Sequence, residues 1–343
     1  MNSESKPNPA GENSRRDFLQ KIGVIAAAAP VAASAAPPVA ANTAAATPMP
    51  MVRFGKHMVS RLIIGCNTLG GLSHLSRMID VDMRKWNTPE QLLADFKHAL
   101  ELGINCVESP RPALVEAVNK LDVGTMLFTT RNQAPLDESI KPGRGAREIA
   151  KTGCIAIHHG GAGETGTDAW WRRGRLDRVR EWCKSVRDAG VVVAVTSHRP
   201  EVFMEIESQD WDVDYYMPCV YKYGRTPAEW EKAYAANPGM APAELYHSRE
   251  GTSANYGGET PFVRGDPPEM YKVIKQTKKP CMVYKILASG RLCEKQEFVE
   301  ATFKEYFAKI KPTDAVVVGH YTKHEDQYAI NAEYVRRFGR LET

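Results

Sequence analysis

The sequence predicts an α/β protein with a (β/α)8 TIM-barrel fold, an N-terminal hairpin and an inserted lid-like segment. Eight short apolar runs, each followed by a segment with helical periodicity, predict a parallel sheet with helical crossovers. Eight such units in about 290 residues favour a closed barrel over an open doubly wound sheet. A Gly-x-Gly-x-x-Gly pattern does not open a helix after the first run, which argues against a dinucleotide-binding open sheet.

The predicted strands are short and apolar, and most end in polar residues. Such continuous apolar runs are typical of parallel strands that are covered on both faces. A hairpin-like piece at residues 52–56 precedes the first of them. The runs predicted as strands are residues 60–67, 104–109, 126–131, 154–159, 191–198, 215–222, 280–287 and 315–320.

Helix signals lie between these runs. Thr88 is expected to cap a helix, with Pro89 at its first position, Gln91 completing a capping-box pattern and Gly103 after its end. Residues 224–266 interrupt the alternation of strands and helices, because they are rich in Gly, Pro, Tyr and charged residues. We predict an insertion or lid there. Further helices are predicted over residues 112–121, 146–151, 176–189, 200–208, 268–276, 296–309 and 325–338.

The N-terminal segment differs from the rest of the chain and predicts an export signal. Ser14-Arg15-Arg16-Asp17-Phe18-Leu19-Gln20-Lys21 matches the twin-arginine pattern, and an Ala-rich stretch with A-x-A-like cleavage sites follows. That stretch is too short and too rich in Ala for a stable membrane span. We therefore expect residues 1–48 to be a twin-arginine signal peptide and disordered linker. Residues 49–343 are expected to be a single barrel domain, exported to the periplasm or an equivalent compartment by the twin-arginine machinery.

The composition argues against nucleic acid as a partner and against a framework of disulfide bonds. The formal net charge is only +4, and no Lys/Arg cluster dominates the folded part, so nucleic acid is not indicated as a partner. The chain has seven cysteines without a C-x-x-C pair. An odd number in apolar runs favours buried, reduced thiols over a disulfide framework.

Titratable residues gather at the ends of the predicted strands. In a (β/α)8 barrel these ends converge on one mouth, where active sites lie. The mouth therefore predicts a functional site, centred on the run 154–161, in which four apolar residues give way to two adjacent histidines and two glycines. The strand-end residues are Asn67, Glu108, Arg131, His158, His159, Thr196, Ser197, His198, Tyr221, Lys222, Lys285, His320 and Tyr321.

Individual residues keep alternative roles. Glu108 could be a general base, a metal ligand or an ion-pair partner of Arg131. Lys285 could take part in chemistry, bind an anion or neutralise Glu108. The histidines could transfer protons or, with Glu108, hold a divalent metal. Neither an H-x-H nor an H-E-x-x-H spacing supports a metal, so no metal ligand is assigned.

Several segments together resemble the aldo/keto reductase superfamily over about residues 52–338. They are Phe54-Gly55-Lys56 with residues 59–67, residues 99–105, Val195-Thr196-Ser197, residues 285–292, and Val318-Gly319 with Gln327 and Asn331. The resemblance implies a nicotinamide cofactor, NAD(P). In that case Thr196 and Ser197 would hold the amide of the nicotinamide and Tyr221 would stack on its ring. The same resemblance places Gly319, Gln327 and Asn331 in the cofactor-binding segment.

This sequence keeps only part of the catalytic motif of that family. The family uses a tetrad of Asp, Tyr, Lys and His, of which this sequence keeps the histidine, at His158. The aspartate position falls on Glu108 or Ser109, and the lysine position falls near Arg131. The stretch 110–118, where the tyrosine belongs, contains no Tyr, so the family's proton donor is absent from its expected place.

Three functional interpretations follow. The residues predicted as catalytic are Glu108, Arg131, His158 and Lys285. The first interpretation is an exported, aldo/keto reductase-like oxidoreductase with tightly bound NAD(P), acting on a carbonyl or sugar-like substrate, with Tyr221 stacking on the cofactor and His158 or Lys285 in proton transfer. The alternative keeps the barrel without the cofactor, as a lyase, isomerase or hydrolase of a carbohydrate, with or without a metal, through Glu108, His158, His198 and Lys285. The third is an exported carbohydrate-binding protein, whose aromatic-rich insertion would stack on sugar rings.

Overall fold

A computed structural model describes residues 47–133, 145–222, 224–236 and 262–341, which belong to one compact unit. Of the predicted signal peptide and linker at residues 1–48, residues 1–46 lie outside the described residues, as does most of the predicted insertion. No described helix is long and apolar enough to cross a membrane.

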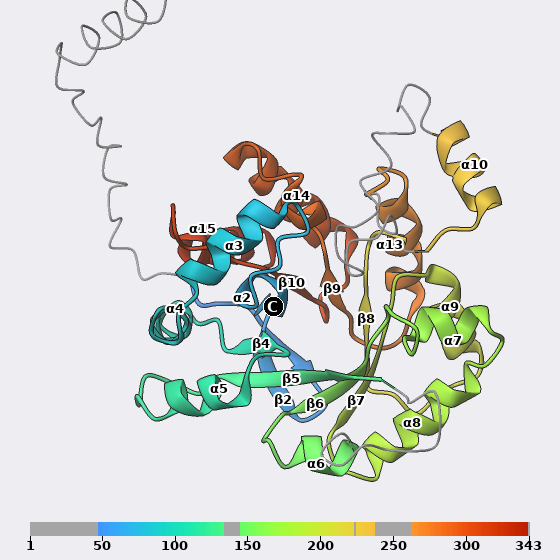
Figure 1. The fold of residues 1–343 in the computed structure, drawn as a ribbon, viewed down its shortest axis with the longest axis horizontal. Coiled ribbons are helices and arrows are strands. Elements are labelled where there is room, and N and C mark those ends of the chain that lie inside the picture. Colours follow the sequence, from blue (N-terminus) through green and yellow to red (C-terminus); the bar gives the residue numbers. More distant parts are fainter. Residues whose placement is uncertain (1–46, 134–144, 223, 237–261, 342–343) are drawn as a thin grey trace, which may run out of the picture. The chain divides into compact units, whose positions relative to one another are not determined.

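The eight predicted strands all form, and they make one parallel sheet in the order β8-β7-β6-β5-β4-β3-β10-β9 (Figure 1). Two further parallel bridges, Tyr216 with Cys281 and Cys219 with Tyr284, join β8 to β9 and complete the barrel. The predicted fold class is therefore confirmed. The strands are β3 (Leu62–Ile64), β4 (Cys106–Glu108), β5 (Leu127–Asn132), β6 (Ala156–His159), β7 (Val192–Ser197), β8 (Tyr215–Pro218), β9 (Met282–Tyr284) and β10 (Ala315–Val318).

Helices lie outside the sheet, between successive strands. The predicted ones are α4 (Pro89–Glu101), α5 (Pro112–Asn119), α6 (Ala146–Ala150), α8 (Asp177–Arg187), α9 (Pro200–Ser208), α13 (Asp266–Gln276), α14 (Gln296–Lys309) and α15 (Gln327–Phe338). Those not predicted are α2 (Cys66–Leu69), α3 (Arg77–Trp86), α7 (Thr167–Arg172), the short 3-10 helix η1 (Ala288–Gly290) and α10 (Pro227–Ala236), which falls in the predicted insertion.

The start of α4 confirms part of the predicted capping pattern. The Gln91 backbone N–H donates to the Thr88 hydroxyl at 3.2 Å, and Pro89 is the first helical residue, as predicted. The Gln91 side chain donates instead to Asp95, so it forms an i,i+4 contact rather than closing the capping box.

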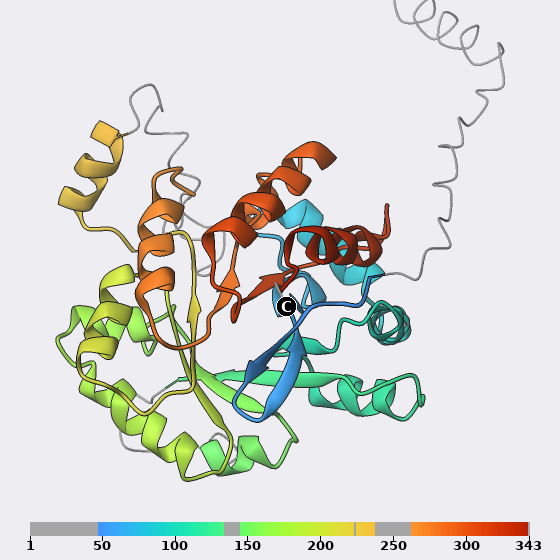
Figure 2. The same cartoon turned by 180° about the vertical axis from the view of Figure 1, so that it is seen from behind.

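A hairpin of β1 (Met51–Phe54) and β2 (His57–Ser60) covers the N-terminal end of the barrel (Figure 2, blue). Its apolar side chains join the apolar residues that fill the barrel interior, and the Phe54 ring packs edge-on against Tyr215 at 4.8 Å. With this end filled by apolar groups, the polar strand ends face the opposite end of the barrel.

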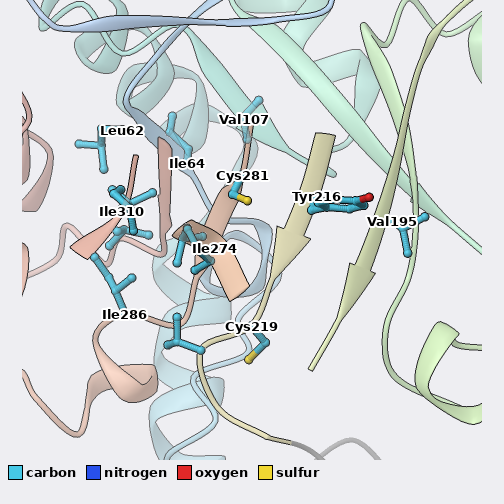
Figure 3. Close-up of a cluster of buried hydrophobic side chains, with 14 of the residues drawn as sticks. Leu62, Ile64, Val107, Val195, Tyr216, Cys219, Ile274, Cys281, Ile286 and Ile310 are labelled. Atoms are coloured by element: carbon cyan, nitrogen blue, oxygen red, sulfur yellow. The ribbon is translucent and has the colours of Figure 1, made fainter. Parts of the chain in front are cut away.

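The outward faces of the strands pack against the helices in a second, larger apolar cluster. Figure 3 shows part of it, with Leu62, Ile64 and Val107 on the strands, Ile274 on α13 and Ile310 after α14. Because both faces of each strand are covered, the strands read as continuous apolar runs in the sequence. Of the seven cysteines, all free, five are buried, in keeping with the predicted reduced thiols.

Candidate active site

A cavity of about 1430 Å³ opens at the carboxyl ends of the strands. All four residues predicted as catalytic, Glu108, Arg131, His158 and Lys285, lie in its wall. Side chains along a strand alternate between the two faces of the sheet. That alternation, together with the parallel register of Arg131 beside His158, brings residues from separate strands to one surface. The predicted convergence at the mouth therefore takes place.

Glu108 and His158 form a buried pair on this wall. The Nε2 atom of His158 lies 3.1 Å from Oε1 of Glu108, and its Nδ1 atom lies 3.0 Å from the hydroxyl of Thr196. Burial raises the pKa of the Glu108 carboxyl, but the hydrogen bond and charge of His158, with hydrogen bonds from Cys66 and Ser109, outweigh it and lower the pKa to about 2. Glu108 is therefore an ionised acceptor facing the cavity, and not an acid. The predicted pairing of Glu108 with Arg131 is replaced by pairing with His158.

His159, expected beside His158 at the mouth, turns the other way. Strand alternation points it outward, where it is fully buried, with Nδ1 2.7 Å from the Thr167 hydroxyl and its ring edge-on to Trp182 at 5.0 Å. Burial lowers the pKa of His159 to about 3. It is a neutral structural residue that ties β6 to the start of α7.

The glycine-rich loop after β6 brings a further carboxylate to the site. A side chain at Gly166 would meet the carbonyl oxygens of Gly161 and Ala162 at 2.3 and 2.4 Å, so only glycine fits this tight return. The backbone N–H groups of Thr167 and Asp168 then donate to the carbonyls of Gly160 and Gly161. This return sets Asp168, at the start of α7, against the end of β7.

Asp168 begins a buried hydrogen-bonded chain that ends in the cavity. Its Oδ2 atom lies 2.7 Å from Nδ1 of His198, and Nε2 of His198 lies 2.9 Å from the hydroxyl of Tyr284. A carboxylate only accepts hydrogen bonds, so Nδ1 carries the imidazole proton and Nε2 accepts the hydroxyl proton of Tyr284. The Ser197 hydroxyl also donates to Asp168, at 2.5 Å, which fixes the carboxylate. His198 and Tyr284 line the cavity, whereas Asp168 lies behind them.

The surroundings of this Asp168–His198–Tyr284 relay keep its two cavity-lining members, His198 and Tyr284, uncharged. Burial lowers the pKa of His198; Asp168 opposes this shift, while Lys285 and Arg131 add to it. Burial also raises the pKa of the Tyr284 phenol well above its usual value. Tyr284 therefore rests as a phenol bonded to a neutral imidazole, and its proton leaves readily only when His198 receives it.

Lys285 reaches the cavity through an unusual backbone. Alternation along β9 points Tyr284 inward and would point the next residue away. Lys285 has φ of +63°, however, and Ala288 and Ser289 are also left-handed, so the chain turns and both neighbours line the cavity. Non-glycine residues in this conformation are strained and concentrate at functional sites.

Three of the six residues that the resemblance implies for NAD(P) line the cavity: Thr196, Gly319 and Gln327. The other three lie behind its wall. Ser197 donates to Asp168, Tyr221 is buried with its ring edge-on to Phe262 at 4.8 Å, and Asn331 is buried in α15. Because the stacking aromatic faces away, these six residues do not make one nicotinamide surface, and no step is derived through that cofactor.

One part of the cavity wall was not predicted from the sequence. The loop before α3 and α3 itself supply part of the wall, including His74, whose Nε2 lies 2.8 Å from Asn67 Nδ2. Burial lowers the pKa of His74 to about 3, so it is neutral. Within the described residues, no three His, Cys, Asp or Glu side chains are grouped so that they could hold a metal ion. The segment's contributions to the wall are Leu72, Ser73, His74, Leu75, Met78, Ile79, Asp82 and Met83.

Asp168 and Tyr284 are the functional candidates that sequence reasoning missed. A period-two count along residues 280–287 would have placed Tyr284, and not Lys285, on the face shared with the barrel interior. The cluster of glycines between His159 and Asp168 was a second signal, because such a loop allows the chain to return to the strand end it has just left.

Comparisons with known proteins identify no family for this chain. No protein-family model matches the chain, and a search of curated proteins finds no match. Among solved structures, a glycerol dehydrogenase from Gluconobacter oxydans aligns with a TM-score of 0.43 and 11% identity over 84% of this chain and 96% of that one. A truncated 3-deoxy-D-arabino-heptulosonate 7-phosphate synthase from Thermotoga maritima aligns with a TM-score of 0.45 and 12% identity over 84% and 91% of the two chains.

A triosephosphate isomerase from Bartonella henselae aligns with a TM-score of 0.34 and 11% identity over 66% of this chain and 86% of that one. Similarity at these identities concerns the fold alone and assigns no activity. The barrel rests on the order of the strands and its closure, and the resemblance to aldo/keto reductases stays a proposal.

Proposed function

We propose that this protein is a barrel enzyme that moves protons on a small, sugar-like carbonyl substrate, as an isomerase or lyase does. The observation that carries the proposal is the Asp168–His198–Tyr284 chain, which links a buried carboxylate through an imidazole to a phenol in the cavity wall. A positioned acid–base group of this kind contributes about 10²–10⁴-fold to a reaction rate.

Tyr284 is the group that meets the substrate. As its oxygen takes a proton from the substrate carbon next to the carbonyl, its own proton passes to Nε2 of His198. The C–H electron pair forms the new C–C double bond, and the π pair of the C=O bond moves to the carbonyl oxygen, which gives an enediolate. Asp168 stabilises the imidazolium so formed, as a buried carboxylate behind a histidine does. The hydroxyl proton of the enediolate moves to the other substrate oxygen, the C–C double-bond pair takes the proton that returns from His198 through Tyr284 to the former carbonyl carbon, and the new carbonyl forms on the neighbouring carbon, which completes an isomerisation.

Glu108 would serve in binding. It is ionised, faces the cavity and is held by His158, so it is a strong acceptor for a substrate hydroxyl. Thr196 orients the other side of the same imidazole. A cavity that offers a fixed carboxylate, two imidazoles and a phenol suits a polyhydroxylated molecule better than an apolar one.

The test is proton exchange in heavy water. The protein is incubated in D2O with a panel of aldoses, ketoses and their acid and phosphate derivatives, and deuterium at the carbon next to the carbonyl is followed by NMR. The proposal expects exchange with one member of the panel that Tyr284→Phe abolishes. Tyr271→Phe is the matched control, because Tyr271 is also largely buried but bonds Glu305 outside the barrel. Equal exchange in wild type and Tyr284→Phe would contradict the proposal.

A second candidate is the nicotinamide-dependent oxidoreductase. One observation favours it: the cavity, at about 1430 Å³, exceeds the usual range of about 300–1,000 Å³ for a single small ligand. Tyr284 would then supply the phenol that the family's tetrad has at another position. One measurement decides between the two candidates. The protein is purified with any bound cofactor retained and is then denatured, and the absorbance spectrum of the released material is compared with that of a reduced nicotinamide.

We also propose that the protein works outside the cytoplasm. The support is the twin-arginine pattern at Arg15 and Arg16. Replacing both by lysine should leave the full-length protein in the cytoplasmic fraction, whereas Lys6→Gln, outside the pattern, should not.

A further inference from the structure

Two cations in the cavity wall face no carboxylate partner. Arg131, at the end of β5, and Lys285, after β9, form no ion pair with any carboxylate among the described residues. Other charges near the cavity are matched: Glu108 pairs with His158, and Asp82 at the rim pairs with Lys323 at 2.6 Å. Among the described residues, these two cations are therefore not bonded to a carboxylate, although the Glu108 carboxylate lies in the same wall.

The two cations differ in exposure, since Lys285 is half-buried and Arg131 is exposed. Lys285 is half-buried, its Nζ lies 5.5 Å from the centre of the Phe262 ring, and it adopts a left-handed backbone. A buried cation without a partner costs stability, and such a cost persists where a ligand repays it. Arg131 has its backbone N–H fixed by the Ser109 hydroxyl at 2.8 Å, while its side chain remains exposed to the cavity.

Both cations line the cavity that also contains His198 and Tyr284. The strand order places β5, which carries Arg131, opposite β9, which Lys285 follows, so the two cations approach the cavity from opposite sides of the barrel. Both charges lower the pKa of His198. Asp168, Tyr284 and His74 also act on His198, and of these three Asp168 favours its protonation. An anion held between the two cations would sit within reach of Tyr284.

From these contacts we propose that Arg131 and Lys285 form an anion site for the substrate, which carries a carboxylate or phosphate group beside its carbonyl-bearing carbons. This rests on the proposed function, because it places the anion next to the relay that transfers protons. The planar fork of Arg131 suits two oxygens of such a group, and Lys285 supplies a point charge from the other side.

The proposal has a consequence for the relay. An anion that neutralises the two cations removes the repulsion that they exert on a His198 imidazolium, so His198 becomes a better proton acceptor when substrate is bound. A neutral sugar would fill the same cavity without this gain, which makes the anion a basis for selecting substrates.

The test measures binding and not turnover. Inorganic phosphate and malonate are titrated into the full-length protein by calorimetry at low salt, with glycerol as a neutral probe. Both anions should bind and glycerol should not. Arg131→Gln and Lys285→Met should each weaken binding at least tenfold. Lys323→Gln is the matched control: it removes a nearby charge that Asp82 already neutralises, and it should leave the affinity unchanged.

The two anions also separate the sources of the charge, since tighter phosphate binding indicates a phosphate ester and tighter malonate binding indicates a sugar acid. The site is overturned if neither anion binds, or if both variants, folded by circular dichroism, bind as tightly as wild type. Tyr284→Phe should lose proton exchange but keep the anion affinity. Failure of wild type to bind either anion, with exchange that Tyr284→Phe abolishes, would overturn the anion site alone. Anion binding together with exchange that Tyr284→Phe retains would overturn the proposed function alone.

Discussion

Two imidazoles of the cavity wall, those of His158 and His198, have the same kinds of hydrogen-bonding partner but differ in what they can do. His158 lies between a carboxylate and a hydroxyl, those of Glu108 and Thr196. His198 also lies between a carboxylate and a hydroxyl, those of Asp168 and Tyr284. In the first set the hydroxyl is an alcohol, which does not lose a proton near neutral pH, whereas in the second it is a phenol, which titrates.

The position of the carboxylate differs as well. Glu108 stands in the cavity wall, where a substrate can reach it, while Asp168 is buried behind His198. The first set is thus arranged to hold an ionised acceptor, and the second to pass a proton between the cavity and the interior. Similar hydrogen-bonding patterns therefore give different chemistry, because the terminal group and its exposure decide which proton can move.

The largest expected effect is at the end of the relay. Tyr284→Phe keeps the ring and its packing but removes the hydroxyl, and we expect activity to fall about 10³-fold, within the range for a lost general acid–base group. The melting temperature should change little. Initial rates on the substrate found by proton exchange measure this, with Tyr271→Phe as control. Retention of more than a tenth of the activity would mean that the two imidazole sets do not differ as argued.

Asp168→Asn should come next, with a loss of about 10²–10³-fold, because an amide no longer fixes the tautomer of His198. Asp168 raises the pKa of His198 against the effect of burial. Since the neutral imidazole is the form that accepts a proton, removing this carboxylate should move the acidic limb of the rate profile to lower pH. A profile measured from pH 5 to 9 tests the direction, and an unmoved limb would indicate a purely structural role.

Glu108→Gln tests the set of Glu108, His158 and Thr196 through the free energy of unfolding. The folded pKa of Glu108 is about 2, below its unfolded value of about 4.3. Its contribution is therefore present above about pH 4.3 and is lost as the pH falls toward 2. We expect Glu108→Gln to lose on the order of 2–3 kcal/mol near neutral pH. The difference from wild type should shrink in urea unfolding at lower pH.

The control for that change is Glu300→Gln, at the exposed pair with Arg337, which should cost less than about 1 kcal/mol at any pH. A Glu108→Gln variant whose stability relative to wild type does not depend on pH would show that Glu108 is not held ionised by His158.

Thr196→Val should have the smallest effect. It removes one hydrogen bond to Nδ1 of His158 and keeps the shape of the side chain, so we expect a loss of about 1 kcal/mol in unfolding free energy. Activity should stay within about tenfold of wild type, because a single positioning contact is lost. A loss as large as that of Tyr284→Phe would make Thr196 the end of a second relay and remove the contrast between the two sets.

The sequence by itself determined the fold and the place of the site. The eight apolar runs, the helix signals at Thr88 and Pro89 and the hairpin at residues 52–56 rest on local periodicity, capping and turn formation, which neighbouring residues decide. The polar strand ends placed Glu108, Arg131, His158 and Lys285 at one mouth, because barrel topology brings those ends together.

Only the tertiary structure decided which of these groups pair. Asp168 and His198 are joined by the return of a glycine-rich loop, and Tyr284 reaches His198 from a strand 86 residues further along the chain. Likewise, the inward or outward direction of His158 and His159 follows from strand register, which depends on neighbouring strands. Contacts between distant residues depend on the path of the whole backbone, and no local pattern encodes that path.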